Sequence, residues 1–119
     1  MRDHKSLHAW VEAQGIARSV FGLTRECWTP HAAELFRQLQ RSALSIQLNI
    51  AEGHALGDGR FGNHLSMAFG SAVETSELLE LAVQDGSLRK ETGEELLERV
   101  HRCERLLLGL LKRYRPLRK

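Results

Sequence analysis

Residues 35–53 read LFRQLQRSALSIQLNIAEG, and their pattern of apolar side chains indicates the class of structure. Its apolar side chains recur every three or four residues, at Leu35, Phe36, Leu39, Ala43, Ile46 and Ile50. This is the period of one face of an α-helix. Upstream, Thr29 offers an N-cap and Pro30 fits the first helical position, where a missing N–H costs nothing. Three glycines within residues 53–59 mark the end, so we predict a helix over residues 30–53.

The same helical period appears on both sides of this stretch. Further helices are expected over about residues 6–27, 59–84 and 91–114. A capping box from Thr92 to Glu95 can open the last of them, and no segment alternates as a strand does. The connections are too short to cross a bundle, so the helices should run up-down-up-down. We therefore predict one all-α domain over residues 1–119, an antiparallel four-helix bundle with a basic tail at residues 112–119.

The composition is that of an ordinary globular protein. Of 119 residues, 42% are apolar and 27% are charged, which argues against a disordered chain. The N-terminus is charged and no apolar run approaches the roughly 18 residues of a membrane span, so we expect a cytoplasmic protein outside the membrane. Two cysteines, Cys27 and Cys103, are too few for a disulfide framework or a zinc motif and are expected as buried free thiols.

A polar stripe accompanies the apolar face of this helix. Its members are spaced by four, four and three residues and are Arg41, Ser45, Asn49 and Glu52. The next helix carries Ser71 and Glu74 at matching heights, and an Arg41–Glu74 pair across the helices is expected. We favour a hydrogen-bonded network that fixes helix register over a functional site, and both interpretations stay open. No nucleophile, base and orienting residue can be assembled from the stripe, so we predict no catalytic residue.

The stripe and its surroundings resemble a known family. Two runs carry the resemblance, Gln38-x-x-Arg41-x-Ala43-x-Ser45-Ile46-x-x-Asn49-Ile50-Ala51-Glu52-Gly53 and Phe61-x-x-x-Leu65-x-x-Ala68-Phe69-Gly70-Ser71-x-x-Glu74. They are similar to four-helix-bundle proteins encoded in intervening sequences of bacterial 23S rRNA genes, which are related to the accessory variability determinant of diversity-generating retroelements. The resemblance implies an antiparallel bundle that assembles as a homopentamer. For the retroelement relative, it implies binding to reverse transcriptase and nucleic acid.

Leucine is more abundant near the C-terminus than one bundle core needs. Residues 106–111 cover most of the helix circumference, whereas a bundle helix needs an apolar arc of only about 100° or somewhat more. Contiguous apolar surface is rare on soluble monomers, so this surplus predicts a homo-oligomer. The candidate interface consists of Leu106, Leu107, Leu108, Leu110 and Leu111.

Positive charge is concentrated at the same end of the chain. Residues 99–119 hold eight Lys or Arg and one acid, although the net charge of the whole chain is only +2. Such a segment can neutralise phosphates, which predicts a contact surface for RNA or DNA. Its candidate residues are Arg99, Arg102, Arg105, Lys112, Arg113, Arg115, Arg118 and Lys119.

These features favour a binding protein over an enzyme. A nucleic-acid or ribonucleoprotein adapter follows from the basic segment. A protein-interaction scaffold without nucleic-acid binding follows equally well from the leucines and from the acidic stretch Glu74, Glu77 and Glu80, and it stays open as the alternative. A di-iron bundle needs two Glu-x-x-His motifs, and the chain has one, Glu98-x-x-His101. No nucleotide-binding or hydrolase motif is present. We therefore predict a non-enzymatic protein without metal or cofactor, whose partners are itself and either nucleic acid or another protein.

Overall fold

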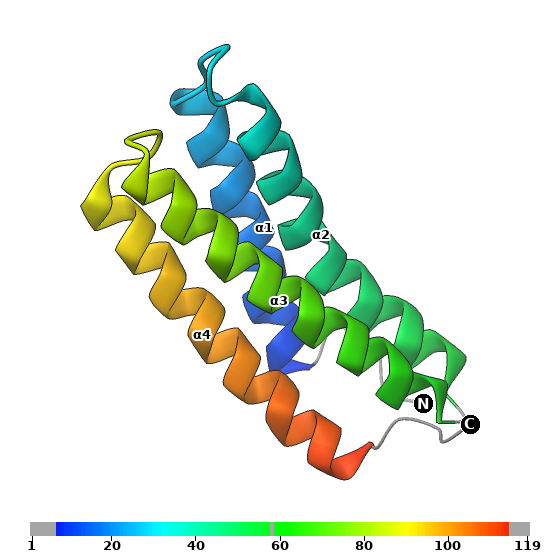
Figure 1. Ribbon diagram of the computed structural model, residues 1–119. Coiled ribbons are helices and arrows are strands. Elements are labelled where there is room, and N and C mark those ends of the chain that lie inside the picture. Colours follow the sequence, from blue (N-terminus) through cyan, green and yellow to red (C-terminus); the bar gives the residue numbers. More distant parts are fainter. Residues whose placement is uncertain (1–6, 58, 115–119) are drawn as a thin grey trace.

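The computed structural model describes residues 7–57 and 59–114. Every regular element in this part of the chain is a helix. The four helices are α1 (His8–Glu26), α2 (Ala33–Leu56), α3 (Arg60–Gln84) and α4 (Lys90–Arg113) (Figure 1). This result confirms the predicted all-α, four-helix fold.

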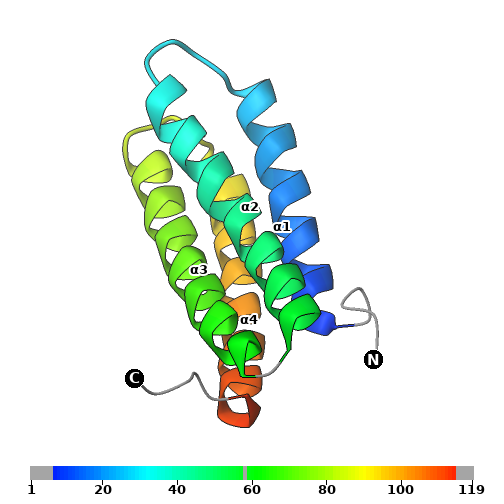
Figure 2. The same ribbon diagram turned by 90° about the vertical axis from the view of Figure 1, so that its right-hand side faces the viewer.

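The four helices surround one core. Each helix packs against its neighbour in the chain, and α4 also packs against α1. The α1–α2 and α3–α4 connections lie at one end of the molecule, and the α2–α3 connection lies at the other (Figure 1, Figure 2). As a result α2 and α3 lie side by side, and the polar side chains between them can meet.

The apolar stripe of residues 35–53 supplies the centre of the core. Its fully buried large side chains are Phe36, Leu39, Ile46 and Ile50. They belong to a cluster that includes Ile16 of α1, Leu65 and Leu79 of α3, and Val100 and Leu107 of α4. Removing one such side chain from water stabilises the fold by about 1.5–3 kcal/mol. The core face predicted from the helical period is therefore confirmed.

The start of α2 differs from the prediction by three residues. Thr29 does act as a cap, since its Oγ1 accepts a hydrogen bond from the Ala32 N–H at 3.1 Å. This cap closes a separate turn, in which the Ala33 N–H donates to the Pro30 carbonyl oxygen at 3.4 Å. Such tight turns are frequent at helix N-termini. The α-helix itself begins only at Ala33.

Gly53 does not end α2, which continues to Leu56. Gly53 is buried against α3, where a Cβ would collide with the Cβ of His64 and lie 3.3 Å from the Cα of Phe61. Its lack of a side chain lets the two helices approach closely. The helix stops at Gly57, whose φ of 61° is a conformation that favours glycine.

The capping box expected at Thr92 is not formed. α4 already begins at Lys90, and the N-cap position, Arg89, has no side-chain cap hydrogen bond. Gly93 is buried where α4 meets Val83 of α3. A glycine that looks unfavourable inside a helix is therefore accommodated by close packing between α3 and α4.

The two cysteines are free thiols in different environments. Cys103 is fully buried, as predicted, and its Sγ lies 3.9 Å from the Ala9 carbonyl oxygen. Burial raises the pKa of the Cys103 thiol to about 12. Cys27 is only half-buried. Across residues 7–57 and 59–114, none of the helices combines the length and the apolar character that crossing a bilayer requires.

Candidate functional surfaces

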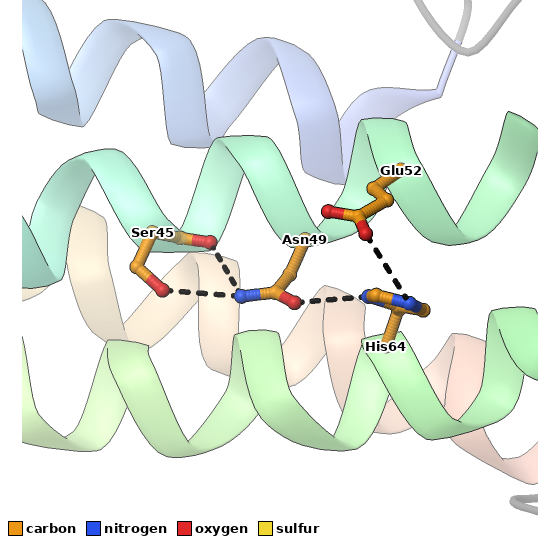
Figure 3. Close-up of polar contacts among 4 residues, drawn as sticks. All are labelled: Ser45, Asn49, Glu52 and His64. Carbon is orange, nitrogen blue, oxygen red and sulfur yellow. Dashed lines mark hydrogen bonds and ion pairs between the residues drawn. The ribbon is translucent and has the colours of Figure 1, made fainter.

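Polar side chains connect α2 and α3 along their shared face. Ser45 Oγ lies 2.8 Å from Ser71 Oγ on the opposite helix. Asn49 Nδ2 donates hydrogen bonds to the Ser45 carbonyl oxygen at 3.0 Å and to Ser45 Oγ at 3.1 Å (Figure 3). The structure therefore brings together three residues of the polar set that the sequence analysis singled out.

His64 extends this arrangement toward the α2–α3 connection. Its Nδ1 lies 3.0 Å from Asn49 Oδ1 (Figure 3). Because an amide oxygen only accepts, Nδ1 carries the proton and Nε2 is the acceptor of the neutral ring. Nε2 faces Glu52 Oε1 at 4.0 Å, and the two form an ion pair only when the imidazole is protonated. Glu52, whose side chain is 64% exposed, thus joins the arrangement at its solvent edge.

Ser42 and Thr75 add a buried step between the same two helices. Thr75 Oγ1 lies 2.9 Å from Ser42 Oγ and 2.8 Å from the Ser71 carbonyl oxygen. In the part of the chain that the structure describes, no buried side-chain nitrogen or oxygen lacks a hydrogen-bond partner. Complete pairing is what a register-fixing network needs. We use the name polar ladder for Ser42, Ser45, Asn49, His64, Ser71 and Thr75.

Three members of the polar ladder were missed from sequence, although each had a detectable signal. Ser42 precedes the predicted Ser45 by three residues, and Thr75 follows Ser71 by four. His64 precedes Ser71 by seven residues, which is about two helical turns. All three therefore share a helix side with a residue that the analysis had already selected.

Arg41 and Glu74 stand outside the polar ladder. Both side chains are exposed, and within residues 7–57 and 59–114 neither forms an ion pair or a hydrogen bond. The Arg41–Glu74 pair expected within the chain is therefore wrong. The reason is rotational: Ser42 and Thr75 face each other, and the preceding residue on each helix points about 100° away from that contact.

The polar ladder is not arranged as a catalytic site. Ser45 Oγ contacts Ser71 and Asn49 but not His64, so hydroxyl and imidazole do not form a nucleophile–base pair. Among the residues that the structure describes, no three His, Cys, Asp or Glu side chains are placed to hold a metal ion. The geometry favours a network that fixes the register of α2 on α3.

The basic segment of α4 has an exposed part and a bonded part. We use the name basic surface for its exposed members, Arg102, Arg105, Lys112 and Arg113. Arg99 differs, because its Nη1 donates to Ser19 Oγ of α1 at 2.8 Å. Its guanidinium also crosses Gly15, where a Cβ would lie 2.6 Å from Nη2, so Arg99 ties α4 to α1. The predicted contacts Arg115, Arg118 and Lys119 lie outside the described residues.

The leucines of α4 do not form one exposed patch. Leu107 is fully buried in the core and cannot belong to an exposed interface. Leu110 and Leu111 are partly buried and pack against the same core. Leu106 and Leu108 are 37% and 45% exposed, but residues two apart on a helix point about 200° from each other. The leucines that the core does not use therefore lie on two different sides of α4 and do not form one surface.

Exposed apolar side chains also lie on the outward sides of α2 and α3, where exposed positions recur every three or four residues. The α2 stripe consists of Arg37, Arg41, Leu44, Leu48, Glu52 and Ala55. The α3 stripe consists of Met67, Gly70, Glu74, Glu77 and Leu81. The α2 stripe was not predicted from sequence, although Leu44 and Leu48 fall off the core period of residues 35–53 and could have revealed it. Of the α3 stripe, only the acids Glu74 and Glu77 were predicted as a contact surface.

Comparison with known proteins matches most of the chain to a protein family. Residues 5–109 match a family model described as 23S rRNA-intervening sequence protein. The match covers both the polar ladder and the two stripes. A search of curated proteins finds no match to the chain.

Proposed function

The chain belongs to the family of 23S rRNA-intervening sequence proteins, and we propose that it is a non-enzymatic adapter that binds nucleic acid. In this proposal it is an antiparallel, up-down-up-down bundle of the cytoplasm that assembles as a homo-oligomer, a homopentamer. The phosphate backbone of RNA or DNA lies on the basic surface of α4. Assembly then presents one basic surface per subunit.

The observation that carries the proposal is the exposure of four unpaired cations on one helix. In the described part of the chain, no carboxylate forms an ion pair with Arg102, Arg105, Lys112 or Arg113. Between the first and the last of them the helix rises by about 16 Å. Duplex DNA carries a charge about every 1.7 Å of its axis, so several phosphates fall within that span.

A simpler explanation accounts for only half of these cations. Basic residues in the last turn of a helix complement its dipole, and Lys112 and Arg113 occupy that turn. Arg102 and Arg105 lie at least two turns before the helix end, where the dipole effect has faded. Tyr114 follows Arg113 at the end of α4, is 40% exposed and holds the Arg113 guanidinium 5.8 Å from its ring centre, and its ring also packs against Phe61 with 4.9 Å between the ring centres. An exposed aromatic ring next to cations is suited to stacking with a base.

The test is fluorescence-anisotropy titration of structured RNA and duplex DNA at 50 and 200 mM salt. A protein that makes 6–10 phosphate contacts should lose about 10³–10⁵ in affinity over that range. The variant R102Q/R105Q should weaken binding and reduce the slope of log K against log salt by about 1.8 for each subunit in contact with DNA. The matched control R89Q/K90Q removes two exposed charges at the opposite end of α4 and should leave the slope unchanged.

A second function, a protein-interaction scaffold, is favoured by one observation. Leu48, Met67 and Leu81 are each about half-exposed, at 54%, 50% and 49%, and large exposed apolar side chains grouped on helix faces suit protein contacts. Absence of nucleic-acid binding at 50 mM salt would leave this scaffold as the better proposal. Equal salt slopes for R102Q/R105Q and R89Q/K90Q would show that any binding uses another surface.

A further inference from the structure

We propose that copies of this chain join head to tail, with the α2 stripe of one copy against the α3 stripe of the next, until the series closes into a ring. The inference rests on the homo-oligomer of the proposed function and adds the two surfaces that meet. The occupant of each stripe is a second copy of this chain.

The α2 stripe is a second contact face on a helix that already has a core face. Leu48 is 54% exposed and Leu44 is 37% exposed. The stripe recurs at three and four residues, as the contact positions of packed helices do. A depression of about 340 Å³ between α1 and α2, lined in part by Phe21 and Leu44, lies beside it. Exposed leucines that recur at the spacing of helix contacts, beside a depression, indicate that α2 can pack against a further helix from a second copy of the chain.

The α3 stripe offers a matching surface. Met67 and Leu81 are 50% and 49% exposed. Between them lies Gly70, where a Cβ would meet nothing within 4 Å. A partner side chain can therefore approach the backbone of α3 at this point. The remaining members of the stripe are the acids Glu74 and Glu77.

The two stripes carry opposite charges where they would meet. The first half of the α2 stripe has Arg37 and Arg41, with Glu52 at its other end, whereas residues 61–84 of α3 contain no Lys or Arg. Two α3 stripes facing each other would set acid against acid. The α2 stripe on the α3 stripe sets base against acid, which steers the partners and fixes their register.

A contact between two unlike surfaces is head-to-tail and generates a ring when its rotation closes. α2 and α3 are neighbours around the core (Figure 2), so their outward sides point in different directions that are not opposite. Successive copies are therefore turned relative to one another and do not continue in a straight line. Such a contact can close an odd number of copies, including the five proposed above, which two-fold contacts alone cannot.

The polar ladder fixes the heights at which the stripes meet. Within one chain Ser42 faces Thr75 and Ser45 faces Ser71. Positions on α2 and α3 whose numbers sum to about the same value therefore lie at the same height along the bundle. A ring axis parallel to the helices carries these heights unchanged from one copy to the next.

At these heights the stripes are complementary residue by residue. Arg41 lies level with the acids of α3 and meets Glu74 or Glu77 of the next copy. Leu48 lies level with the segment between Met67 and Gly70 and meets it across the contact. The Arg41–Glu74 pair, which is absent within the chain, thus forms between chains.

Two single substitutions on opposite sides of the contact test this arrangement by light scattering after size-exclusion chromatography. L48D places a charge in the α2 stripe, and M67D places a charge in the α3 stripe. L108D, which changes a side chain of α4 that is 45% exposed, is the control. We expect the natural protein and L108D to be oligomeric and L48D and M67D to be monomeric. Circular dichroism should be unchanged in all three, because each replaced side chain is about half-exposed.

Mixing the two monomeric variants distinguishes head-to-tail from two-fold contacts. L48D retains a working α3 stripe and M67D a working α2 stripe, so an equimolar mixture should give a one-to-one dimer that cannot grow. Two monomers that stay separate on mixing would overturn the head-to-tail arrangement. An oligomeric L48D or M67D would overturn the assignment of the stripes and leave the proposed oligomer standing, whereas a monomeric natural protein would overturn both.

A charge exchange tests the register. R41E and E74R should each weaken association at least about tenfold, because like charges then face each other. The double variant R41E/E74R restores opposite charges and should recover most of the loss. If the double variant loses as much free energy of association as the two single variants together, the proposed pairing is overturned.

Discussion

Gly53→Ala should destabilise the protein by about 2 kcal/mol, because the added methyl group has no room between α2 and α3. It would collide with the His64 Cβ and lie 3.3 Å from the Phe61 Cα. Neither atom belongs to the far end of a flexible side chain, so the helices themselves must shift. Overpacking of this kind costs up to about 3 kcal/mol. Replacing Gly by Ala in a helix returns about 1 kcal/mol, and the difference gives the predicted loss.

Gly22→Ala is the matched control, since a Cβ there meets nothing within 4 Å and Gly22 lies inside α1, four residues before its end. It should stabilise the protein by about 1 kcal/mol. The assay is urea unfolding followed by far-UV circular dichroism at one fixed protein concentration, because the proposed assembly would link stability to concentration. With about 2.1 cal/mol/K of unfolding entropy per residue, the Gly53 variant should also lose about 8 °C in Tm. Equal stability of the two variants would refute the close approach of α2 and α3 at Gly53.

Ile46→Ala should lower the free energy of unfolding by about 2–5 kcal/mol because the side chain is fully buried. Leu48→Ala, about half a helical turn further on and 54% exposed, should change the stability in urea little. Similar losses would contradict the assignment of the core face. Asn49→Ala should cost about 1–3 kcal/mol, since it leaves the His64 Nδ1–H without its acceptor, and an unfolding midpoint equal to that of the natural protein would contradict the role of the polar ladder. Stability should fall above pH 9, because unfolding lets the Cys103 thiol ionise near its ordinary pKa of 9.0 while burial holds its pKa at about 12 in the folded state. The slope from this thiol is about 1.4 kcal/mol per pH unit between those values; Cys103→Ala should remove it, and identical pH profiles of the two proteins would refute the burial.

Local periodicity was sufficient to predict the core but not the ends of the helices. Buried positions such as Phe36, Leu39 and Ile46 follow from spacing alone, because one face of each helix must leave water. Gly53 and Gly57 look alike in a sequence. Which of them ends α2 depends on how closely α3 approaches, and that distance is set by residues far away in the chain. Glycine at a close approach and glycine at a cap are distinguished only by the tertiary structure.

The candidate sites were predictable only where direction around the helix was taken into account. Ser45 and Ser71 were paired correctly because their spacing placed them on facing sides. Arg41 lies only about 40° from Ser45 around α2, but on the side away from α3, about 100° from the Ser42–Thr75 contact, and its side chain is exposed. The leucines of α4 were judged by their number, whereas their directions divide them between the core and two separate flanks.

The hydroxyl contacts between α2 and α3 also bear on the difference between a closed particle and an endless fibre. A head-to-tail contact closes only if each copy is added without a rise along the axis; any net rise produces a helical filament. Sliding α3 along α2 by one helical turn would shift the two outward surfaces by about 5.4 Å relative to each other. It would also break the Ser42–Thr75 and Ser45–Ser71 contacts. These four small side chains, of which Ser42 and Thr75 are buried and Ser45 and Ser71 are partly buried, thus fix the relative height of the two surfaces, and in the proposed ring this height keeps the assembly finite.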